Sequence, residues 1–204
     1  MISSVTAENL ACTRGERRLF AGLSFRVGQG SALAVTGANG VGKTSLLRLI
    51  AGFIAPSDGT VRLVAKDREI TDAEERGKQI GWLGHHDGLK AQLTVAEQLA
   101  FFARLYGGAR DIAAALQQVG LARQGELPCR YLSAGQKRRL ALARLKITNR
   151  PLWLLDEPLA ALDADGKQLA AQMIAEHCAA GGIVLAATHE PLGVPAAALT
   201  LGAA

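Results

Sequence analysis

The feature of this chain that most constrains its fold is a glycine-rich loop that ends in a lysine and a threonine. Residues 37–44 read Gly-Ala-Asn-Gly-Val-Gly-Lys-Thr, which fits the Walker A pattern. In such a loop, glycines let backbone N–H groups approach a polyphosphate, the lysine brings a charge to its outer phosphates, and the threonine hydroxyl can ligate Mg²⁺. The sequence therefore predicts a phosphate-binding site. Its predicted contact residues are Gly37, Ala38, Asn39, Gly40, Val41, Gly42, Lys43, Thr44 and Ser45.

The segments on either side of this loop match the strand and the helix that such a loop connects. Residues 31–36 form a short apolar run that is typical of a buried strand, and residues 45–51 have a helical pattern. The N-terminus of that helix would direct the positive end of its dipole at the phosphates. A glycine-rich turn that binds nothing is the alternative, but strand, loop and helix all fall where the motif requires them.

Composition narrows the class of protein. The chain has 204 residues, of which 49% are apolar and 20% are charged, as in an ordinary globular protein with one domain over residues 1–204. Aromatic residues make up only 4%, too few for base-stacking platforms, so we expect no nucleic-acid partner. Three scattered cysteines predict neither a disulfide framework nor a metal site. Without a signal peptide pattern or an apolar run of about 18 residues, the chain is expected to stay in the cytoplasm.

Apolar patterns near the N-terminus predict an antiparallel layer. Residues 5–12 and 19–27 are apolar segments that flank a polar turn, which indicates a β-hairpin. A surface connection is expected over residues 66–78, and a helix is expected from Asp163, its cap, to about Ala180. Further strands are predicted at residues 61–64, 79–83, 152–156 and 183–188.

The middle of the chain is predicted to be helical. Helical patterns at residues 95–106, 111–119 and 134–147 follow one another without a strand pattern between them, and Gly107-Gly108 is one predicted break. This indicates a helical subdomain over about residues 85–150. Elsewhere strands and helices alternate around the phosphate loop, which predicts a mostly parallel sheet with helical crossovers. The expected fold class is therefore α/β, of the P-loop NTPase type.

A strand that ends in two carboxylates is the second chemical motif. Residues 152–157 read Leu-Trp-Leu-Leu-Asp-Glu, which is the form of a Walker B strand. At the end of that strand, Asp156 could hold Mg²⁺ and Glu157 could polarise an attacking water. A buried strand capped by two solvated acids is the alternative, which the presence of the Walker A loop makes less favourable.

A third segment gives the family resemblance. Residues 132–136, Leu-Ser-Ala-Gly-Gln, resemble the Leu-Ser-Gly-Gly-Gln signature of ABC-type ATPases, with Ala134 in place of the first signature glycine. Ser133 is also a good cap for the helix that follows, so helix capping alone is the simpler interpretation. A serine hydroxyl, a glycine N–H and a helix N-terminus nevertheless make a site for a terminal phosphate. The signature residues concerned are Ser133, Ala134, Gly135 and Gln136.

The resemblance to ABC-type ATPases spans essentially the whole chain and implies an ABC-type nucleotide-binding domain that hydrolyses Mg²⁺-ATP. Residues 160–163 resemble the family's D-loop, so Asp163 is an expected nucleotide-site residue. His189 follows a strand where the family places its switch histidine, and with Glu157 and Lys43 it forms the expected catalytic set. In that family the signature completes the nucleotide site of a partner subunit, which implies a homodimer of cassettes.

Two positions depart from the family pattern. His85 stands where the family usually has the Q-loop glutamine, and it could join the Mg²⁺ environment or relay movement to a membrane partner. Arg14 stands in the turn where an aromatic residue usually stacks on adenine. Its guanidinium could stack on the base or could simply be solvated.

These departures, with Leu19-Phe20-Ala21-Gly22-Leu23 and Gly84-His85-His86-Asp87-Gly88, resemble the ATP-binding subunits of bacterial cytochrome c maturation complexes, the haem-exporter type. That resemblance implies integral membrane subunits as partners, a haem-loaded chaperone as an indirect partner, and a peripheral location on the cytoplasmic face of the bacterial inner membrane. The alternatives are another ABC transporter, a soluble non-transport ABC ATPase, and a nucleotide-sensing module without turnover.

Overall fold

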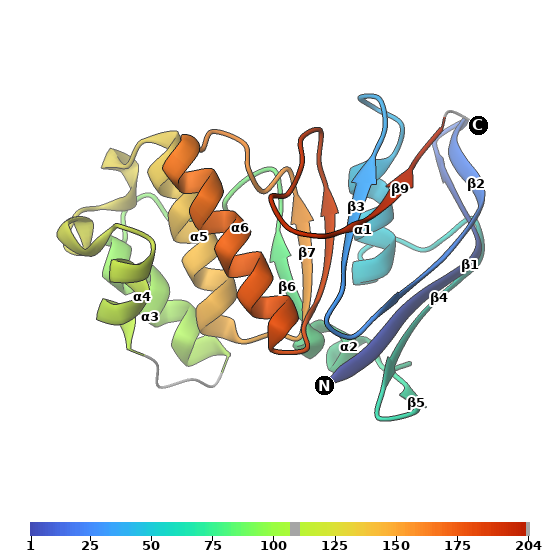
Figure 1. The fold of residues 1–204 in the computed structure, drawn as a ribbon, viewed down its shortest axis with the longest axis horizontal. Helices are drawn as coiled ribbons and strands as arrows, with labels where there is room; N and C mark the ends of the chain where they lie inside the picture. The colour runs from blue at the N-terminus through green and yellow to red at the C-terminus, as the bar shows by residue number, and fades with distance from the viewer. Residues whose placement is uncertain (107–110, 203–204) are drawn as a thin grey trace.

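Two β-sheets with different strand directions carry the fold of this chain. The computed structural model describes residues 1–106 and 111–202. A four-stranded antiparallel sheet has the order β2-β1-β4-β5, and a five-stranded parallel sheet has the order β6-β7-β8-β3-β9 (Figure 1). The antiparallel strands are β1 (Ile2–Arg14), β2 (Arg17–Gly28), β4 (Asp58–Ala65) and β5 (Arg68–Glu69). The parallel strands are β3 (Ala32–Thr36), β6 (Ile80–Leu83), β7 (Leu152–Asp156), β8 (Ile183–Ala187) and β9 (Ala197–Thr200).

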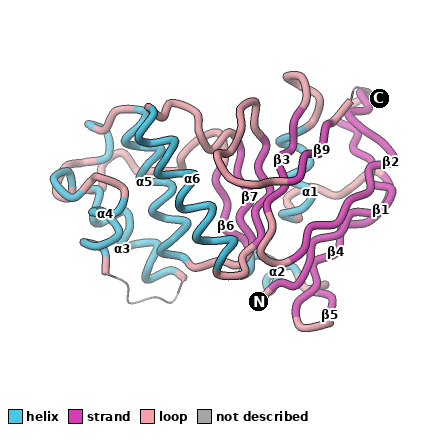
Figure 2. The backbone as a smooth tube through the Cα atoms, in the orientation of Figure 1, coloured by secondary structure: helices cyan, strands magenta, loops and turns pink. Residues whose placement is uncertain are grey.

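Helices cover both faces of the parallel sheet. Helix α1 lies between the two sheets, whereas α5 and α6 lie on the other face, with α3 and α4 beyond them (Figures 1 and 2). The helices are α1 (Lys43–Ala51), α2 (Ala73–Gln79), α3 (Val95–Leu105), α4 (Ile112–Gln118), α5 (Ala134–Thr148) and α6 (Ala164–Ala179), with short 3₁₀ helices at Ala122–Gln124 and Cys129–Tyr131.

Strand β7 shows why the central strands are apolar throughout. Successive side chains of a strand point to opposite faces, and both faces of this sheet are covered. Trp153 and Leu155 therefore pack in the hydrophobic cluster of α3, α5 and α6, whereas Leu152 and Leu154 pack in the cluster of α1 and the antiparallel sheet. The run that the sequence presents before Asp156 is thus buried on both sides, and its carboxyl end emerges at one edge of the sheet.

Most predicted elements are confirmed, and the differences have physical reasons. The hairpin and the three helical patterns are present as β1–β2 and as α3, α4 and α5. Residues 66–78 lie largely on the surface, as predicted, but they contain β5 and α2, which were not predicted; α2 has no buried residue and so leaves no apolar periodicity. Strand β9 was missed because it is short and largely exposed and forms only by pairing with β3. The break predicted at Gly107-Gly108 lies outside the described residues.

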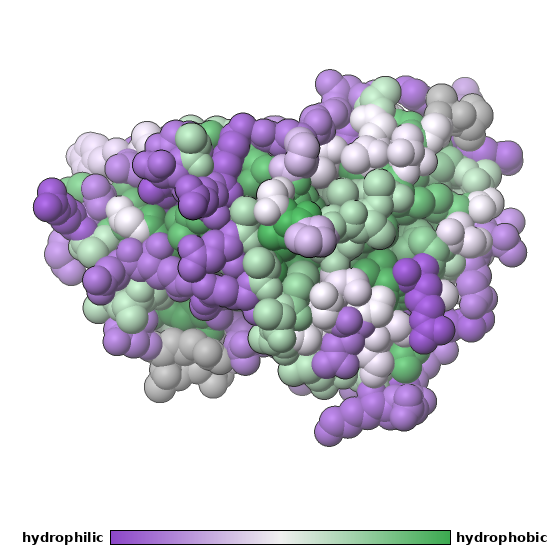
Figure 3. Space-filling view, viewed as in Figure 1, coloured by the Kyte–Doolittle hydropathy of each residue, from purple (hydrophilic) through white to green (hydrophobic). Residues whose placement is uncertain are grey.

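Hydrophilic and apolar side chains gather in different regions of the surface (Figure 3). In the orientation of Figure 1, hydrophilic side chains cover much of the helices at the left, and apolar ones gather over the middle of the face (Figure 3). Within residues 1–106 and 111–202, no helix is both long enough and apolar enough to cross a bilayer.

One histidine, His177, is partly buried beside the central sheet. The His177 ring stacks on Trp153 with a centroid distance of 3.9 Å and an interplanar angle of 10°. A Cβ added to Gly182 would lie 2.2 Å from Nε2 of His177, so the ring also closes against the chain that leads into β8. Burial lowers the pKa of His177 from 6.5 to about 4, and backbone contacts with Pro151 and Ile183 oppose this only in part.

His177 should make the stability of the fold depend on pH. The unfolded chain binds a proton at this imidazole below pH 6.5 and the folded chain only near pH 4, so stability is lost as the pH falls through that window. We expect a loss of about 2 kcal/mol between neutral pH and pH 4.5, after allowing for partial solvent screening. Urea unfolding of His177→Phe should lack this component. The exposed His86→Gln change is the control, and an unchanged pH dependence in His177→Phe would contradict the assignment.

Candidate functional site

The predicted phosphate loop connects β3 to α1 in a backbone conformation that requires glycine. Gly37 and Gly42 have φ angles of 137° and 113°, which other residues rarely adopt. A Cβ on Gly37 would lie 2.5 Å from the carbonyl oxygen of Leu201, and one on Gly42 would lie 3.0 Å from the Phe20 ring. The residue directly after β9 and the β1–β2 hairpin therefore lie against this loop from two sides, and the glycines permit that approach.

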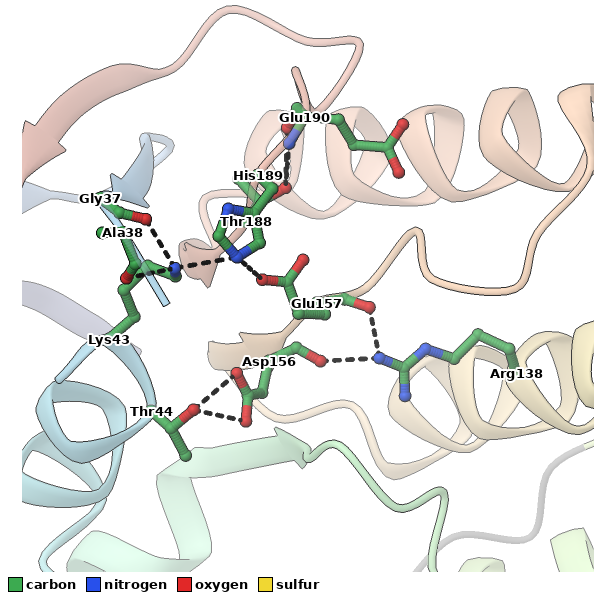
Figure 4. Close-up of polar contacts among 10 residues, drawn as sticks. All are labelled: Gly37, Ala38, Lys43, Thr44, Arg138, Asp156, Glu157, Thr188, His189 and Glu190. Atoms are coloured by element: carbon green, nitrogen blue, oxygen red, sulfur yellow. Dashed lines mark hydrogen bonds and ion pairs between the residues drawn. The ribbon is translucent and has the colours of Figure 1, made fainter. Parts of the chain in front are cut away.

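Lys43 lies at the centre of a set of polar contacts above this loop. Its Nζ donates to the carbonyl oxygens of Gly37 at 2.8 Å and Ala38 at 3.2 Å, and it lies 3.0 Å from Nε2 of His189 (Figure 4). The same His189 nitrogen lies 3.3 Å from Oε1 of Glu157. With a proton on Nε2 the imidazole donates to the carboxylate, and without one it accepts from the ammonium. The three residues predicted as the catalytic set are thus in one chain of contacts.

Thr44 and Asp156 face each other across the start of α1 and the end of β7. The Thr44 hydroxyl lies 3.0 Å from each carboxylate oxygen of Asp156 (Figure 4). A hydroxyl and a carboxylate are the hard oxygen donors that Mg²⁺ prefers, and Mg²⁺ commonly takes few protein ligands and completes its shell with phosphates and water. The residues present fit that metal. In the described parts of the chain, no cluster of three or more His, Cys, Asp or Glu side chains could hold a metal by itself.

Parallel strand pairing brings these residues to the same edge of the sheet. Asp156 pairs with Ala187, and the N–H of Glu157 donates to the carbonyl of Ala187 at 2.8 Å. On the other side of β8, the N–H of Thr188 donates to the carbonyl of Val35 at 3.1 Å. The carboxyl ends of β7, β8 and β3 therefore lie side by side, where ligands bind in open parallel sheets.

A cavity of about 610 Å³ opens above this edge. His85, predicted from its place in the sequence, lines it, whereas Arg14 is not among the lining residues. Leu19 and Arg48 line it as well. Neither belongs to a motif; Leu19 reaches the cavity because the hairpin folds over the loop, and Arg48 because it lies along α1. The remaining lining residues are Asn39, Gly40, Gly42, Lys43, Thr44, Ser45, Asp156, Glu157, Ala160 and His189.

Arg14 does not line this cavity. It is exposed and ends β1. Burial raises the pKa of the Cys12 thiol, and both the positive charge of Arg14 and a hydrogen bond with Ser45 oppose that rise. The guanidinium is therefore within electrostatic reach of the Cys12 thiol.

The predicted signature residues line a second cavity, of about 520 Å³, which shares no lining residue with the first. Ser133 and Gln136 form a capping box: the Ser133 Oγ accepts from the N–H of Gln136 at 3.2 Å, and the Gln136 side chain accepts from the N–H of Ser133 at 2.9 Å. A Cβ on Gly135 would lie 2.9 Å from the carbonyl of Ala161. Ser133 thus caps α5. The four residues of the signature also line an open cavity: Ser133, Ala134, Gly135 and Gln136.

Asp163 belongs to this second cavity and not to the one beside Lys43. It caps α6 by accepting from the N–H of Gly166 at 2.9 Å, and Arg139 donates to it at 2.5 Å. The Arg139 hydrogen bond is the main cause that lowers the pKa of the Asp163 carboxyl. Arg139 lines the cavity too, although no motif singled it out. One chain therefore holds the predicted nucleotide residues in two separate places.

Comparisons with known proteins agree with this arrangement. A family model described as ABC transporter matches residues 20–160. Cytochrome c biogenesis ATP-binding export protein CcmA of Rhodopseudomonas palustris (strain BisB18) is 51% identical over 201 residues, and the alignment covers 98% of each chain. The protein of the same name from Nitrobacter winogradskyi is 48% identical, also with 98% of each chain covered.

Solved structures show the same fold. A putative ABC transporter (ATP-binding protein) from Pyrococcus furiosus superposes with a TM-score of 0.84 at 24% identity and covers 98% of both chains. A structure described as the ATP-binding subunit of an ABC transporter superposes with a TM-score of 0.80 at 22% identity, covering 92% of this chain and 80% of that one.

The Thr44–Asp156 pair predicts a metal-dependent component of nucleotide affinity. Asp156→Asn keeps the shape of the side chain but removes its charge, so Mg²⁺ should no longer strengthen ATP binding, whereas metal-free binding should stay within about twofold. Titration of a fluorescent ATP analogue with and without Mg²⁺ measures both.

Two further variants calibrate that titration. The exposed Asp165→Asn change on α6 should behave as the wild type. His85→Gln should retain nucleotide binding and change the rate of turnover. Full Mg²⁺ enhancement in Asp156→Asn would remove this residue from the metal site, and loss of binding in His85→Gln would show that His85 has a different role.

Proposed function

The chain belongs to the ABC transporter family of ATPases and, within it, to the cytochrome c biogenesis ATP-binding export proteins, and on that premise we propose that its ATP hydrolysis releases a haem-loaded chaperone from a membrane complex. The observation that carries the proposal is the contact chain of Lys43, His189 and Glu157 beside the Thr44–Asp156 pair. It supplies the parts that hydrolysis needs within a chain that is about half identical to those export proteins over nearly its full length.

The side chains divide the work of hydrolysis. Lys43 offsets charge on the outer phosphates, and the loop N–H groups hold them in place. Glu157 polarises the attacking water, and His189 orients it through the same carboxylate. Thr44 and Asp156 would hold Mg²⁺, which would neutralise negative charge on the phosphates when bound. His85 lines the same cavity and is proposed to report the state of this site to its surroundings.

A second copy of the chain is proposed to complete each site. Ser133 to Gln136 and Asp163 line a cavity separate from that of Lys43, so the residues expected around one nucleotide do not meet within one chain. A head-to-tail pair brings the signature cavity of one copy over the loop cavity of the other, and a two-fold axis makes two such sites. The helix N-terminus at Ser133 then faces the terminal phosphate.

Complementation between two inactive variants tests this pairing. Lys43→Ala removes the charge of the loop, and Ser133→Glu places a carboxylate where the signature would meet phosphate. Each alone should show no Mg²⁺-dependent phosphate release. An equimolar mixture should recover up to roughly a quarter of wild-type turnover, because half of the dimers are mixed and each holds one intact site.

The matched control is a mixture of Lys43→Ala with Lys43→Met, which should remain inactive. If the first mixture also stays inactive although both variants are folded by circular dichroism, the site is not shared between copies in this way.

A groove at the other end of the parallel sheet is the proposed contact with the membrane subunits. It has a volume of about 310 Å³ and lies among the end of α1, the start of β6, α3 and α5. Phe53, with 62% of its surface exposed, packs edge-on against Trp82 at 5.2 Å. Arg144 and Arg150 lie over the rings of Phe102 and Tyr106 at 4.9 and 4.5 Å. An exposed aromatic groove with guanidinium groups over its rings fits a partner segment that is apolar with a polar edge.

We propose that the chain is a peripheral subunit on the cytoplasmic face of the inner membrane. Its function is tested by capturing the tagged chain from detergent-solubilised membranes. Membrane subunits and a haem-loaded chaperone should be retained, and ATP with Mg²⁺ should release the chaperone. Glu157→Gln should bind ATP but reduce turnover by at least about 100-fold and release no chaperone.

Two surface variants control that capture. Phe53→Glu should lose the membrane subunits, whereas Leu127→Glu, at another exposed apolar position, should keep them. Retention of membrane subunits without any haem protein would favour a different ABC transporter. Capture of none by the wild type would favour a soluble ABC ATPase, and release of the chaperone by Glu157→Gln would reject the assigned role of hydrolysis.

A further inference from the structure

One buried guanidinium, that of Arg138 on α5, joins parts of the site that lie far apart in the sequence. Only 3% of Arg138 is exposed. Its Nη2 donates to the carbonyl oxygens of Asp156 at 2.7 Å and Glu157 at 2.5 Å, as Figure 4 shows. Its Nη1 donates to the carbonyl of Gly84 at 2.9 Å and to Oδ1 of Asp87 at 2.8 Å. Arg138 therefore holds the end of β7 and the segment around His85 in one relative position.

The burial of this charge explains why the arrangement is rigid. A buried cation is costly unless it is paired and hydrogen-bonded, and bonds that involve an ionised donor are stronger than neutral ones. The Nη groups of Arg138 meet four acceptors, but its Nε has no partner among the described residues. Displacing either segment would leave the guanidinium with still fewer partners. Because both sets of bonds start from one side chain on α5, a shift of α5 would weaken the bonds to both segments together.

Glu157 needs such support because its backbone is strained. Its φ angle is 50°, in the left-handed region that non-glycine residues rarely occupy. Its N–H is held by the carbonyl of Ala187, and its own carbonyl accepts from Arg138 and from the N–H of Ala160 at 3.1 Å. This backbone conformation aims the carboxylate at His189, 3.3 Å away. Contact with Arg138 thus helps to set the direction of the side chain that polarises water.

Arg138 also lies close to the signature on the same helix. Helix α5 starts at Ala134, directly after the Ser133 cap, so Arg138 follows little more than one turn later. A shift of this helix end therefore moves the guanidinium and the groups it holds. The neighbouring Arg139 is bonded to Asp163 in the signature cavity. Within one chain, the signature cavity is expected to meet the nucleotide bound by the partner copy. Through α5 and Arg138 this cavity is connected to the Glu157 carboxylate, which is expected to act on the nucleotide bound by the chain itself.

We infer that Arg138 is a positioning residue that couples the signature end of α5 to Glu157 and to the His85 segment of the same chain, so that closure of one shared site sets the geometry of the other. The inference rests on the proposed pairing of two copies. It assigns no contact with nucleotide to Arg138, which does not line the cavity beside Lys43. Its consequence is cooperativity between the two sites, which a purely structural arginine would not create.

Kinetics of Arg138 variants in the full-length chain test this inference. Arg138→Met should bind a fluorescent ATP analogue within about twofold of wild type, because the loop cavity is intact, and its kcat should fall about ten- to hundredfold. The Hill coefficient for ATP should fall from above 1 to 1. Arg138→Lys, which keeps the charge but not the four-bond fork, should recover part of kcat. Asp87→Asn, which weakens only the contact to the His85 segment, should cause a smaller loss of kcat than Arg138→Met.

The surface variant Arg123→Met is the matched control and should behave as wild type. Wild-type kcat and Hill coefficient in a folded Arg138→Met variant would overturn the inference. A fall in thermal stability and ATP affinity together, without a separate effect on kcat, would also overturn it and leave Arg138 a structural residue. If Arg138→Met does not fold, the same criteria apply to Arg138→Lys. Absence of turnover in the wild type would instead reject the proposed function.

Discussion

The parallel pairing of β3 with β8 and of β8 with β7 is the constraint on which the rest of this structure depends. It places three strand ends side by side, and each end leads into a different part of the site: the phosphate loop, His189, and the pair Asp156 and Glu157. Because the pairing fixes the register, Asp156 is held opposite Thr44 and Glu157 opposite His189 at hydrogen-bonding distances. The positions of the reacting groups therefore follow from the strand register. Buried side chains on both faces of the sheet prevent a shift of that register.

The layers around that sheet explain how the site is connected to its surroundings. Helix α1 carries Lys43 and Thr44 at one end and leads to the groove around Phe53 at the other, and α5 runs from the signature residues towards the same groove. The nucleotide edge and the proposed membrane contact are therefore opposite ends of the same helices. Arg138 links α5 to the end of β7, so a movement of the helical layer would also move the end of this strand.

The separation of two cavities in one chain gives the protein its proposed mode of action. A complete site within one chain could hydrolyse ATP without any partner. Here the signature residues lie away from Lys43, and pairing of copies is proposed to bring them together. Hydrolysis would then be tied to closing and reopening of the pair, which is the movement that a membrane partner in the Phe53 groove would use.

By itself, the sequence determined the short-range features: the loop before Lys43, the carboxylates after an apolar strand, the Ser133 cap and the helical middle of the chain. These were predictable because each depends on residues close together in the chain. The resemblance to ABC-type ATPases placed Lys43, His189 and Glu157 in one expected catalytic set. Only the tertiary structure decided the contacts between them, that Leu19 and Arg48 line the same cavity, and that Asp163 does not. It alone revealed β9 and the four bonds of Arg138. Those features arise from strand pairing and from helix packing across many residues, for which no local pattern of side chains gives a signal.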